Sequence, residues 1–259
     1  FDSFFDENGN IRSIPEESTL LLGDLSNKKM IINAPITIKA LSEDSTLVNT
    51  TINLVAGADN SVIDGLNMEF TGDNTTGSIG LIYIKDVTNV TISNNKITVP
   101  DFVNKTGAKR GSAVYAIEVE SGMLGCKDIF INNNVIDMAG TCRYIYGIDV
   151  FKTYGSENRN NNINIFENNV TINGATGMAE AIYVSESDDV IIDGNIISST
   201  SNGAAYGVAT DQLTNAVITS NKITADAATQ AYGITATTSG SGTIIRANEI
   251  DAKGAGAIG

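Results

Sequence analysis

A short pattern of apolar residues around an Asn recurs along most of the chain. With φ for an apolar residue it reads φ-x-φ-x-x-Asn-x-φ, as in residues 90–97, 190–197 and 216–223. Leu66 takes the place of the Asn in an early copy, and the Asn itself stands at six positions: Asn95, Asn134, Asn168, Asn195, Asn221 and Asn248. From Asn168 onward the copies recur every 26 or 27 residues. Self-similarity at this period indicates a solenoid, whose units bury their apolar faces only by stacking on one another.

Alternation within each copy predicts which side chains point inward, because residues two apart in a strand share a face. One inward stack consists of Ile63, Ile92, Ile131, Ile165, Ile192, Ile218 and Ile245. A second stack lies beyond the bend and consists of Met68, Ile97, Ile136, Val170, Ile197, Ile223 and Ile250. A further short strand precedes the pattern in each unit, for example at residues 115–117, 146–148 and 206–208.

Three short strands in each turn, rich in Ile and Val, predict an all-β fold. The expected architecture is a right-handed parallel β-helix, a three-sheet solenoid of about seven to nine coils around one core. The leucine-rich repeat shares the central motif and is the alternative. It requires Leu at the apolar positions and a helix or compact turn outside, which residues 198–205 are unsuited to form. The β-helix is therefore preferred.

The repeated Asn has a structural explanation that needs no ligand. It stands at a tight bend, and Asn tolerates the left-handed backbone conformation better than most residues. Asn side chains stacked in register can also hydrogen-bond from coil to coil. We therefore expect a structural Asn ladder along the bend.

The chain divides into an atypical start and a repetitive remainder. Residues 1–46 are predicted to form an N-terminal cap and a first rough coil, with Phe1, Phe4, Phe5, Ile11 and Ile14 covering the open end of the core. Residues 47–259 are predicted to be the β-helix repeats, one continuous domain truncated at its C-terminus. The chain is thus expected to be a fragment of a larger protein.

Composition excludes several classes of function. The net charge is −14 at pH 7, which argues against binding of nucleic acid or of an anionic membrane surface. With no His and two Cys, the chain offers no zinc site. No metal or cofactor is predicted, although the acidic surface would suit calcium.

The two cysteines leave two interpretations open. Cys126 and Cys142 fall in the same long turn and flank one strand–Asn–strand unit. The loops that carry them could meet, which would allow a disulfide. Two separate buried thiols are the alternative.

Consecutive long turns point to a candidate binding region. These turns cover residues 100–112, 122–127, 139–144 and 153–162, and stacking should place them side by side along one rim. The adjoining strands should direct these side chains outward: Tyr83, Lys85, Glu118, Glu120, Asp149, Phe151, Tyr183 and Ser185. Aromatic rings, carboxylates and a Lys on a flat sheet suit a carbohydrate. We predict ligand contacts from Tyr83, Lys85, Glu118, Glu120, Asp149 and Tyr183; an ordinary polar outer face is the alternative.

Two of these carboxylates also allow a catalytic alternative. Glu118 and Asp149 occupy equivalent positions on adjacent coils, which would place their carboxyl groups roughly 5–6 Å apart, near the separation used by retaining glycosidases. Lyases and hydrolases on this fold need a calcium-bound Asp cluster with Arg or Lys, or Asp with His, and this chain has no His. No catalytic motif matches well.

Several segments resemble methanogenic archaeal adhesin-like proteins. Residues 4–10 read FFDENGN and residues 13–20 read SIPEESTL, while IINAPITI at 31–38 and DDVIIDGN at 188–195 are similar too. The resemblance implies a large cell-surface protein with parallel β-helix repeats that contacts other cells or polysaccharide. It supplies no catalytic residues.

The leading prediction is thus a non-catalytic ectodomain fragment of an extracellular, cell-surface adhesin. Its partner would be a surface glycan or a surface protein of another cell. The alternatives are a polysaccharide lyase or glycoside hydrolase that uses Glu118 and Asp149, and a purely structural stalk.

Overall fold

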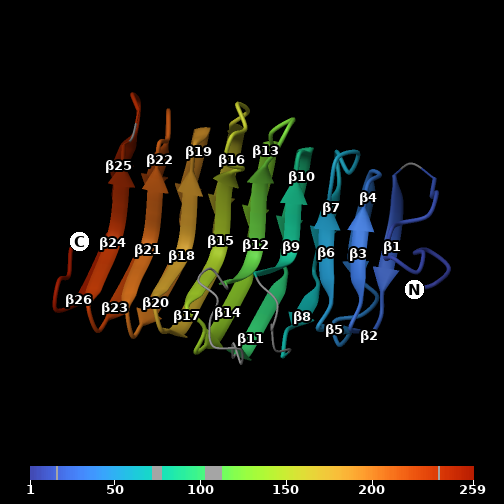
Figure 1. The fold of residues 1–259 in the computed structure, drawn as a ribbon, viewed down its shortest axis with the longest axis horizontal. Helices are drawn as coiled ribbons and strands as arrows, with labels where there is room; N and C mark the ends of the chain where they lie inside the picture. Colours follow the sequence, from blue (N-terminus) through green and yellow to red (C-terminus); the bar gives the residue numbers. More distant parts are fainter. Residues whose placement is uncertain (16, 72–77, 103–112, 239) are drawn as a thin grey trace.

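The computed structural model describes residues 1–15, 17–71, 78–102, 113–238 and 240–259. In these residues the chain forms a right-handed parallel β-helix, in which three sheets of parallel strands surround one core. The coils lie side by side along a rod, with the N-terminus at one end and the C-terminus at the other (Figure 1). The predicted fold is therefore confirmed, and the leucine-rich repeat is excluded because the described residues contain no helix.

Each coil contributes one strand to each sheet in turn. The first sheet contains β1 (Ser18–Leu22), β4 (Ile36–Ala40), β7 (Val62–Asp64), β10 (Thr88–Ser93), β13 (Lys127–Asn132), β16 (Asn160–Phe166), β19 (Ser187–Asp193), β22 (Val217–Thr219) and β25 (Ile244–Arg246). The second contains β2 (Leu25–Ser26), β5 (Thr46–Val48), β8 (Asn67–Glu69), β11 (Lys96–Phe102), β14 (Val135–Gly140), β17 (Asn169–Ala175), β20 (Ile196–Ser201), β23 (Lys222–Ala227) and β26 (Glu249–Gly254). The third contains β3 (Lys29–Ile32), β6 (Thr51–Leu54), β9 (Ile79–Lys85), β12 (Ala113–Ser121), β15 (Tyr144–Lys152), β18 (Met178–Ser185), β21 (Ala204–Asp211) and β24 (Gln230–Thr237).

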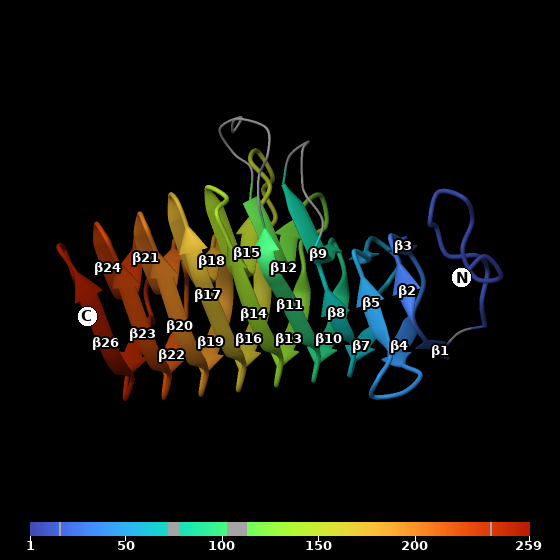
Figure 2. The same ribbon diagram turned by 90° about the horizontal axis from the view of Figure 1, so that it is seen from below.

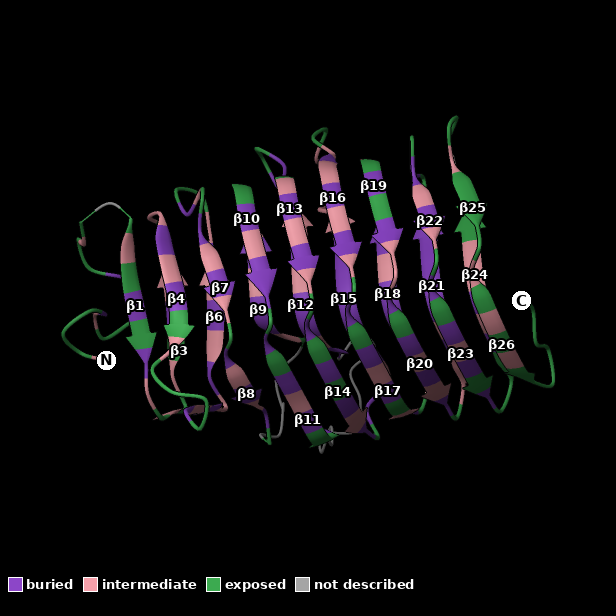
Figure 3. Ribbon diagram, turned by 180° about the vertical axis from the view of Figure 1, so that it is seen from behind, coloured by how far each residue is buried: buried purple, intermediate pink, exposed green. Residues whose placement is uncertain are grey.

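The core consists of apolar side chains stacked in register. In the first sheet Ile63 pairs with Ile92, and the row continues coil by coil to Ile245, which was predicted to be buried but is exposed in the last coil. In the second sheet the row from Met68 to Ile250 is aligned in the same way. Both rows are those predicted from the sequence. Figure 3 shows the resulting alternation of buried and more exposed residues along the strands.

The bend between the first and second sheets differs from the prediction in one respect. The left-handed conformation belongs to the residue before each repeated Asn: Asn94, Asn133, Glu167, Gly194, Ser220 and Ala247 have φ between 53° and 64°. The repeated Asn themselves are not among the described residues with positive φ. A residue of any type at the exposed corner takes the unusual backbone angle, and the Asn side chain is free to turn inward.

The Asn side chains form a continuous hydrogen-bonded ladder inside the bend. Asn134 is representative: its backbone N–H and its Nδ2 both donate to Oδ1 of Asn168, each at 3.0 Å. Its Nδ2 also donates to the carbonyl of Ile92 in the preceding coil at 2.9 Å. The same set of contacts links Asn95 at one end of the ladder to Asn248 at the other. Each buried amide is thus satisfied by the two neighbouring coils.

Phe5 and Ile11 of the N-terminal segment are buried in the core, and Phe1 and Ile14 pack against it. Phe5 is buried and stacks on Phe1 with ring centroids 4.6 Å apart, whereas Phe4 is largely exposed. Regular strands begin already at Ser18, and the segment predicted as a first rough coil supplies parts of two successive coils.

The two cysteines do not form a disulfide. Cys126 and Cys142 are separate buried thiols, which is the second of the two sequence interpretations. Cys126 lies at the corner before β13 and Cys142 at the corner after β14, so two strands separate them around the coil. Each Sγ instead contacts a nearby carbonyl, that of Glu120 at 3.4 Å and that of Tyr144 at 3.3 Å.

Candidate functional site

The middle coils of the third sheet carry polar and aromatic side chains in rows on their outer face. Pairing aligns Tyr83, Glu118, Asp149 and Tyr183 on four adjacent strands, which we call the carboxyl row. A second row, two positions further along each strand, contains Lys85, Glu120 and Phe151. The structure thus brings together all six side chains that the sequence predicted as ligand contacts.

A further row lies on the same outer face and was missed by the sequence analysis. It runs through Gly80, Tyr115, Tyr146, Glu180, Tyr206 and Tyr232, and we call it the tyrosine row. Strict alternation from Glu118 would place Tyr115 on the inner face. The strand instead contains two consecutive buried residues, Ala116 and Ile117, which shift the alternation by one.

Small residues make this shift sterically feasible. A Cβ added to Gly147, the equivalent of Ala116 on the next coil, would lie 2.5 Å from the carbonyl oxygen of Ala181 and 2.6 Å from Val170 Cγ1. The recurring Tyr-Gly and Tyr-Ala pairs were therefore the signal in the sequence. At each such pair the small residue and the residue after it are both buried, so the Tyr before them lies on the outer face.

The tyrosine row contains two stacked pairs. The rings of Tyr115 and Tyr146 lie 4.9 Å apart with an interplanar angle of 13°. Tyr206 and Tyr232 stack in the same way, at 4.7 Å and 13°. Offset or parallel contacts at such distances stabilise neighbouring coils, and the half-buried rings leave aromatic surface on the outside of the sheet.

These rows carry three carboxyl groups on consecutive coils: Glu118 and Asp149 in the carboxyl row, and Glu180 in the tyrosine row. Asp149 and Glu180 each have only 5% of their surface exposed. Burial raises the pKa of Glu180 to about 7. Burial, with the charge of Glu120 beside it, raises the pKa of Glu118 to about 7 as well.

Asp149 is the one of the three carboxyl groups in the least favourable surroundings for ionisation. Burial first, and then the charges of Glu118 and Glu180, raise the pKa of its carboxyl well above the usual range. Its Oδ1 is buried and makes no hydrogen bond. The carboxyl group of Glu118 lies against Gly80, because a Cβ atom at residue 80 would be only 2.6 Å from Glu118 Oε2. The glycine thus leaves room for one carboxyl of the group.

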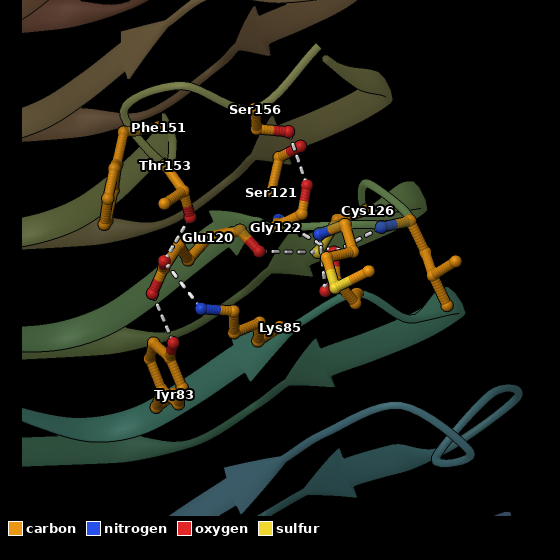
Figure 4. A network of polar contacts seen from close by, with 12 residues as sticks. Tyr83, Lys85, Glu120, Ser121, Gly122, Cys126, Phe151, Thr153 and Ser156 are labelled. Atoms are coloured by element: carbon orange, nitrogen blue, oxygen red, sulfur yellow. Dashed lines mark hydrogen bonds and ion pairs between the residues drawn. The ribbon is translucent and has the colours of Figure 1, made fainter. Parts of the chain in front are cut away.

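Glu120 lies in a separate, saturated network (Figure 4). Its Oε1 pairs with Lys85 Nζ at 2.8 Å and accepts a hydrogen bond from the Thr153 hydroxyl, while Tyr83 donates to its Oε2. These bonds outweigh the burial of the carboxylate and lower its pKa. Tyr83, Lys85 and Glu120 therefore satisfy one another and are less available to a ligand than the sequence suggested.

Two loops stand beside this network. The loop at 122–125 is held by Asp86, whose carboxylate accepts backbone N–H bonds of 2.7–3.1 Å from all four of its residues. The loop at 153–159 donates to it through Ser156 and Asn158. Figure 2 shows the loop after β15 rising from the middle of the rod. Between the loops lies an open pocket of about 600 Å³, lined partly by Met123 and the fully exposed Tyr154.

The predicted rim is shorter than expected. Half of 139–144 belongs to β14 and the start of β15, which leaves only a three-residue turn between them. Residues 103–112 of the predicted loop 100–112 lie outside the described residues.

Neither a metal centre nor a membrane span emerges from the described part of the chain. No three of its Cys, Asp and Glu side chains are arranged to hold a metal ion. No helix in it is long and apolar enough to cross a membrane.

Comparison with known proteins adds little beyond the fold. No protein-family model and no curated relative matches the chain. The Dettilon tailspike protein is 13% identical with a TM-score of 0.30, and the match covers 90% of this chain but only 61% of the tailspike chain. The A-module of the Azotobacter vinelandii mannuronan C-5 epimerase AlgE6 is 13% identical with a TM-score of 0.28, covering 93% of this chain and 89% of its own. Nothing about activity follows from values this low.

Proposed function

We propose that this chain is a binding and display module of an extracellular, cell-surface adhesin. Its ligand is a glycan that lies across the outer face of β9, β12, β15 and β18. The observation that carries the proposal is the concentration of tyrosines and carboxyl groups on these adjacent strands, beside the loops at 122–125 and 153–159. The resemblance of the opening residues to adhesin-like proteins agrees with this role.

The chemistry of this face suits a polysaccharide. The rings of Tyr115 and Tyr146 face each other along the rod, so they offer their edges and hydroxyl groups to a ligand on the outer face, and the hydroxyls can donate or accept hydrogen bonds. Carboxyl groups bind sugar hydroxyls. Adjacent coils repeat these groups about every 4.8 Å, so an extended ligand can contact several coils at once.

A glycan array tests the proposal, with two aromatic variants compared. Tyr115→Ala together with Tyr146→Ala should weaken binding of the best ligand at least tenfold. Tyr232→Ala is the matched control, because it disrupts a similar stacked pair away from Asp149, and it should leave binding unchanged. Equal binding by all three proteins would place the ligand elsewhere, and binding of no glycan would favour a structural stalk.

A polysaccharide-cleaving enzyme is the second candidate. Glu118 pairs with Asp149 on the next strand, and its pKa near 7 suits a general acid. The pKa of Asp149 is raised as well, however, so this pair lacks the ionised partner that a nucleophile or base requires. A hydrolysis screen should therefore release no sugar. Release that Glu118→Gln abolishes would overturn the adhesin proposal.

A further inference from the structure

Exposed apolar side chains gather on the two loops that stand beside the third sheet, at 122–125 and 153–159. Tyr154 is fully exposed, and Met123 and Leu124 keep 85% and 71% of their surfaces exposed. Met123 and Tyr154 come from different loops but line the same open pocket of about 600 Å³. Apolar side chains that share one exposed surface mark a site of interaction, because a ligand that covers them removes their apolar area from water.

Both loops are held in place by hydrogen bonds within the chain. Asp86 accepts backbone N–H bonds from all four residues of the first loop. Ser156 donates to the carbonyl of Gly122, and Asn158 Nδ2 donates to that of Met123, which joins the second loop to the first. The walls of the pocket are thus preorganised, which reduces the conformational entropy that is lost when a ligand binds.

The ring of Tyr154 is placed to stack on a ligand. Because the whole side chain is exposed, both faces of this ring are open, whereas the rings of Tyr115 and Tyr146 face each other. The C–H face of a sugar ring is apolar and packs on an open aromatic face. Met123 adds a flexible apolar side chain to the same pocket, which can adapt to the outline of the sugar.

Polar side chains line the rest of the pocket and suit the hydroxyl groups of a sugar. Glu157 and Asn158 are exposed there and offer oxygen atoms as hydrogen-bond acceptors. Lys85 also lines the pocket, but its charge is paired with Glu120 at 2.8 Å. Asp86 adds a second carboxylate to the lining, so a ligand with acidic groups would be repelled. The lining therefore favours an uncharged sugar.

The pocket lies at the end of the strands on which the glycan was proposed to lie. β12 ends at Ser121 and β15 ends at Lys152, directly before the two loops. Lys85 is the last residue of β9, and it both lines the pocket and pairs with Glu120 on the outer face of the sheet. A glycan on this face therefore reaches the pocket by continuing along the strands. The volume of the pocket falls in the range of about 300–1,000 Å³ that is typical of small-molecule sites.

We infer that the pocket between the loops at 122–125 and 153–159 binds a sugar ring of an uncharged glycan, and that this ring stacks on Tyr154. The inference rests on the glycan-binding function proposed above, and it names the class of sugar and its main contact. A second copy of the chain is the other occupant that could cover these apolar side chains. The net charge of −14 and the carboxylates in the lining oppose such self-association.

Titration calorimetry with neutral and acidic hexamers tests the inference. The neutral probes are 1,4-linked hexamers of glucose, mannose and galactose, and the acidic probe is the corresponding hexamer of galacturonic acid. At least one neutral hexamer should bind, and the acidic hexamer should bind at least tenfold more weakly.

Variants of Tyr154 then locate the contact. Tyr154→Ala should weaken binding of the neutral hexamer about tenfold with an unchanged melting temperature, since the side chain is fully exposed. Tyr154→Phe keeps the ring and should bind like the unmodified chain. Leu41→Ala is the matched control and should change nothing, because Leu41 is also exposed but lies directly after β4.

The outcomes separate the inference from the proposed function. Binding of a neutral hexamer that survives Tyr154→Ala would overturn the inference and leave glycan binding standing. So would a preference for the acidic hexamer, or failure of all three neutral hexamers while another glycan binds on the array. Self-association in sedimentation measurements that Tyr154→Ala abolishes would assign the pocket to a second copy of the chain. Failure to bind any glycan would overturn the proposed function and the inference together.

Discussion

The Asn ladder and the acidic side chains Glu118, Asp149 and Glu180 of the third sheet both bring polar groups together on consecutive coils, but only the ladder is satisfied. Each Asn in it from Asn95 to Asn221 donates to the coil on one side and to the coil on the other. Asp149, by contrast, keeps a buried oxygen without a partner and lies between two further acids. A set of polar side chains that satisfies itself stabilises the rod, whereas a buried carboxyl group that lacks a partner costs stability.

The largest effect on stability should come from a carboxyl group introduced into the apolar core. Ile192 is fully buried in the stack of the first sheet. Ile192→Asp would bury a charge among apolar side chains, so we expect a loss of more than about 4 kcal/mol and of cooperative unfolding. Thermal denaturation followed by circular dichroism measures this. Ile191→Asp is the control, since Ile191 is exposed on the neighbouring position of the same strand. An unchanged melting temperature for Ile192→Asp would contradict the core described here.

The next largest effect should be the pH dependence of stability that Glu180 confers. Its pKa is about 7 in the folded chain against 4.5 for the free side chain. A raised pKa means that the folded state holds the proton more tightly, so the contribution is complete below about pH 4.5 and is lost as the pH rises through about 7. Stability should therefore fall between pH 5 and pH 8, by roughly 2–4 kcal/mol from this residue.

Glu180→Gln should reduce this slope by the share of Glu180, because the amide does not titrate, while Glu118, whose pKa is also about 7, keeps part of the slope. Urea denaturation at several pH values measures it. Glu43→Gln, at an exposed position, should retain the slope of the unmodified chain. A slope that is unchanged in Glu180→Gln would assign the pH dependence to other groups.

The ladder should respond more moderately to loss of one member. Asn168→Ala removes a buried amide that bonds to Asn195 and to the carbonyl of Ile131, which should cost about 1–3 kcal/mol. The next residue provides the control, since Asn169 is exposed and Asn169→Ala should cost about 0.5 kcal/mol or less. Equal effects in urea denaturation would mean that the ladder contributes little.

The sequence predicted the fold well because its signal is repeated in every coil. The Ile stacks and the ladder follow from a period that many copies confirm, so an error at one copy is corrected by the next. The site was predicted only in part. Period-2 alternation located Glu118 and Asp149 but placed Tyr115 on the wrong face, because the shift at Ala116 depends on the three-dimensional path of the strand. Whether an outward carboxyl is paired, as in Glu120, or unpaired, as in Asp149, depends on residues from other coils.

The contrast between the Asn ladder and the acidic side chains is tested most directly by the stability of Asp149→Asn at neutral pH. Because Asp149 is a buried acid whose pKa is raised, replacing it with an amide of the same shape should raise the free energy of unfolding by about 1–3 kcal/mol. Urea denaturation measures this, with Asp137→Asn as the unchanged control. A decrease in the stability of Asp149→Asn would contradict the account, because it would show that Asp149, like the Asn ladder, holds the fold together.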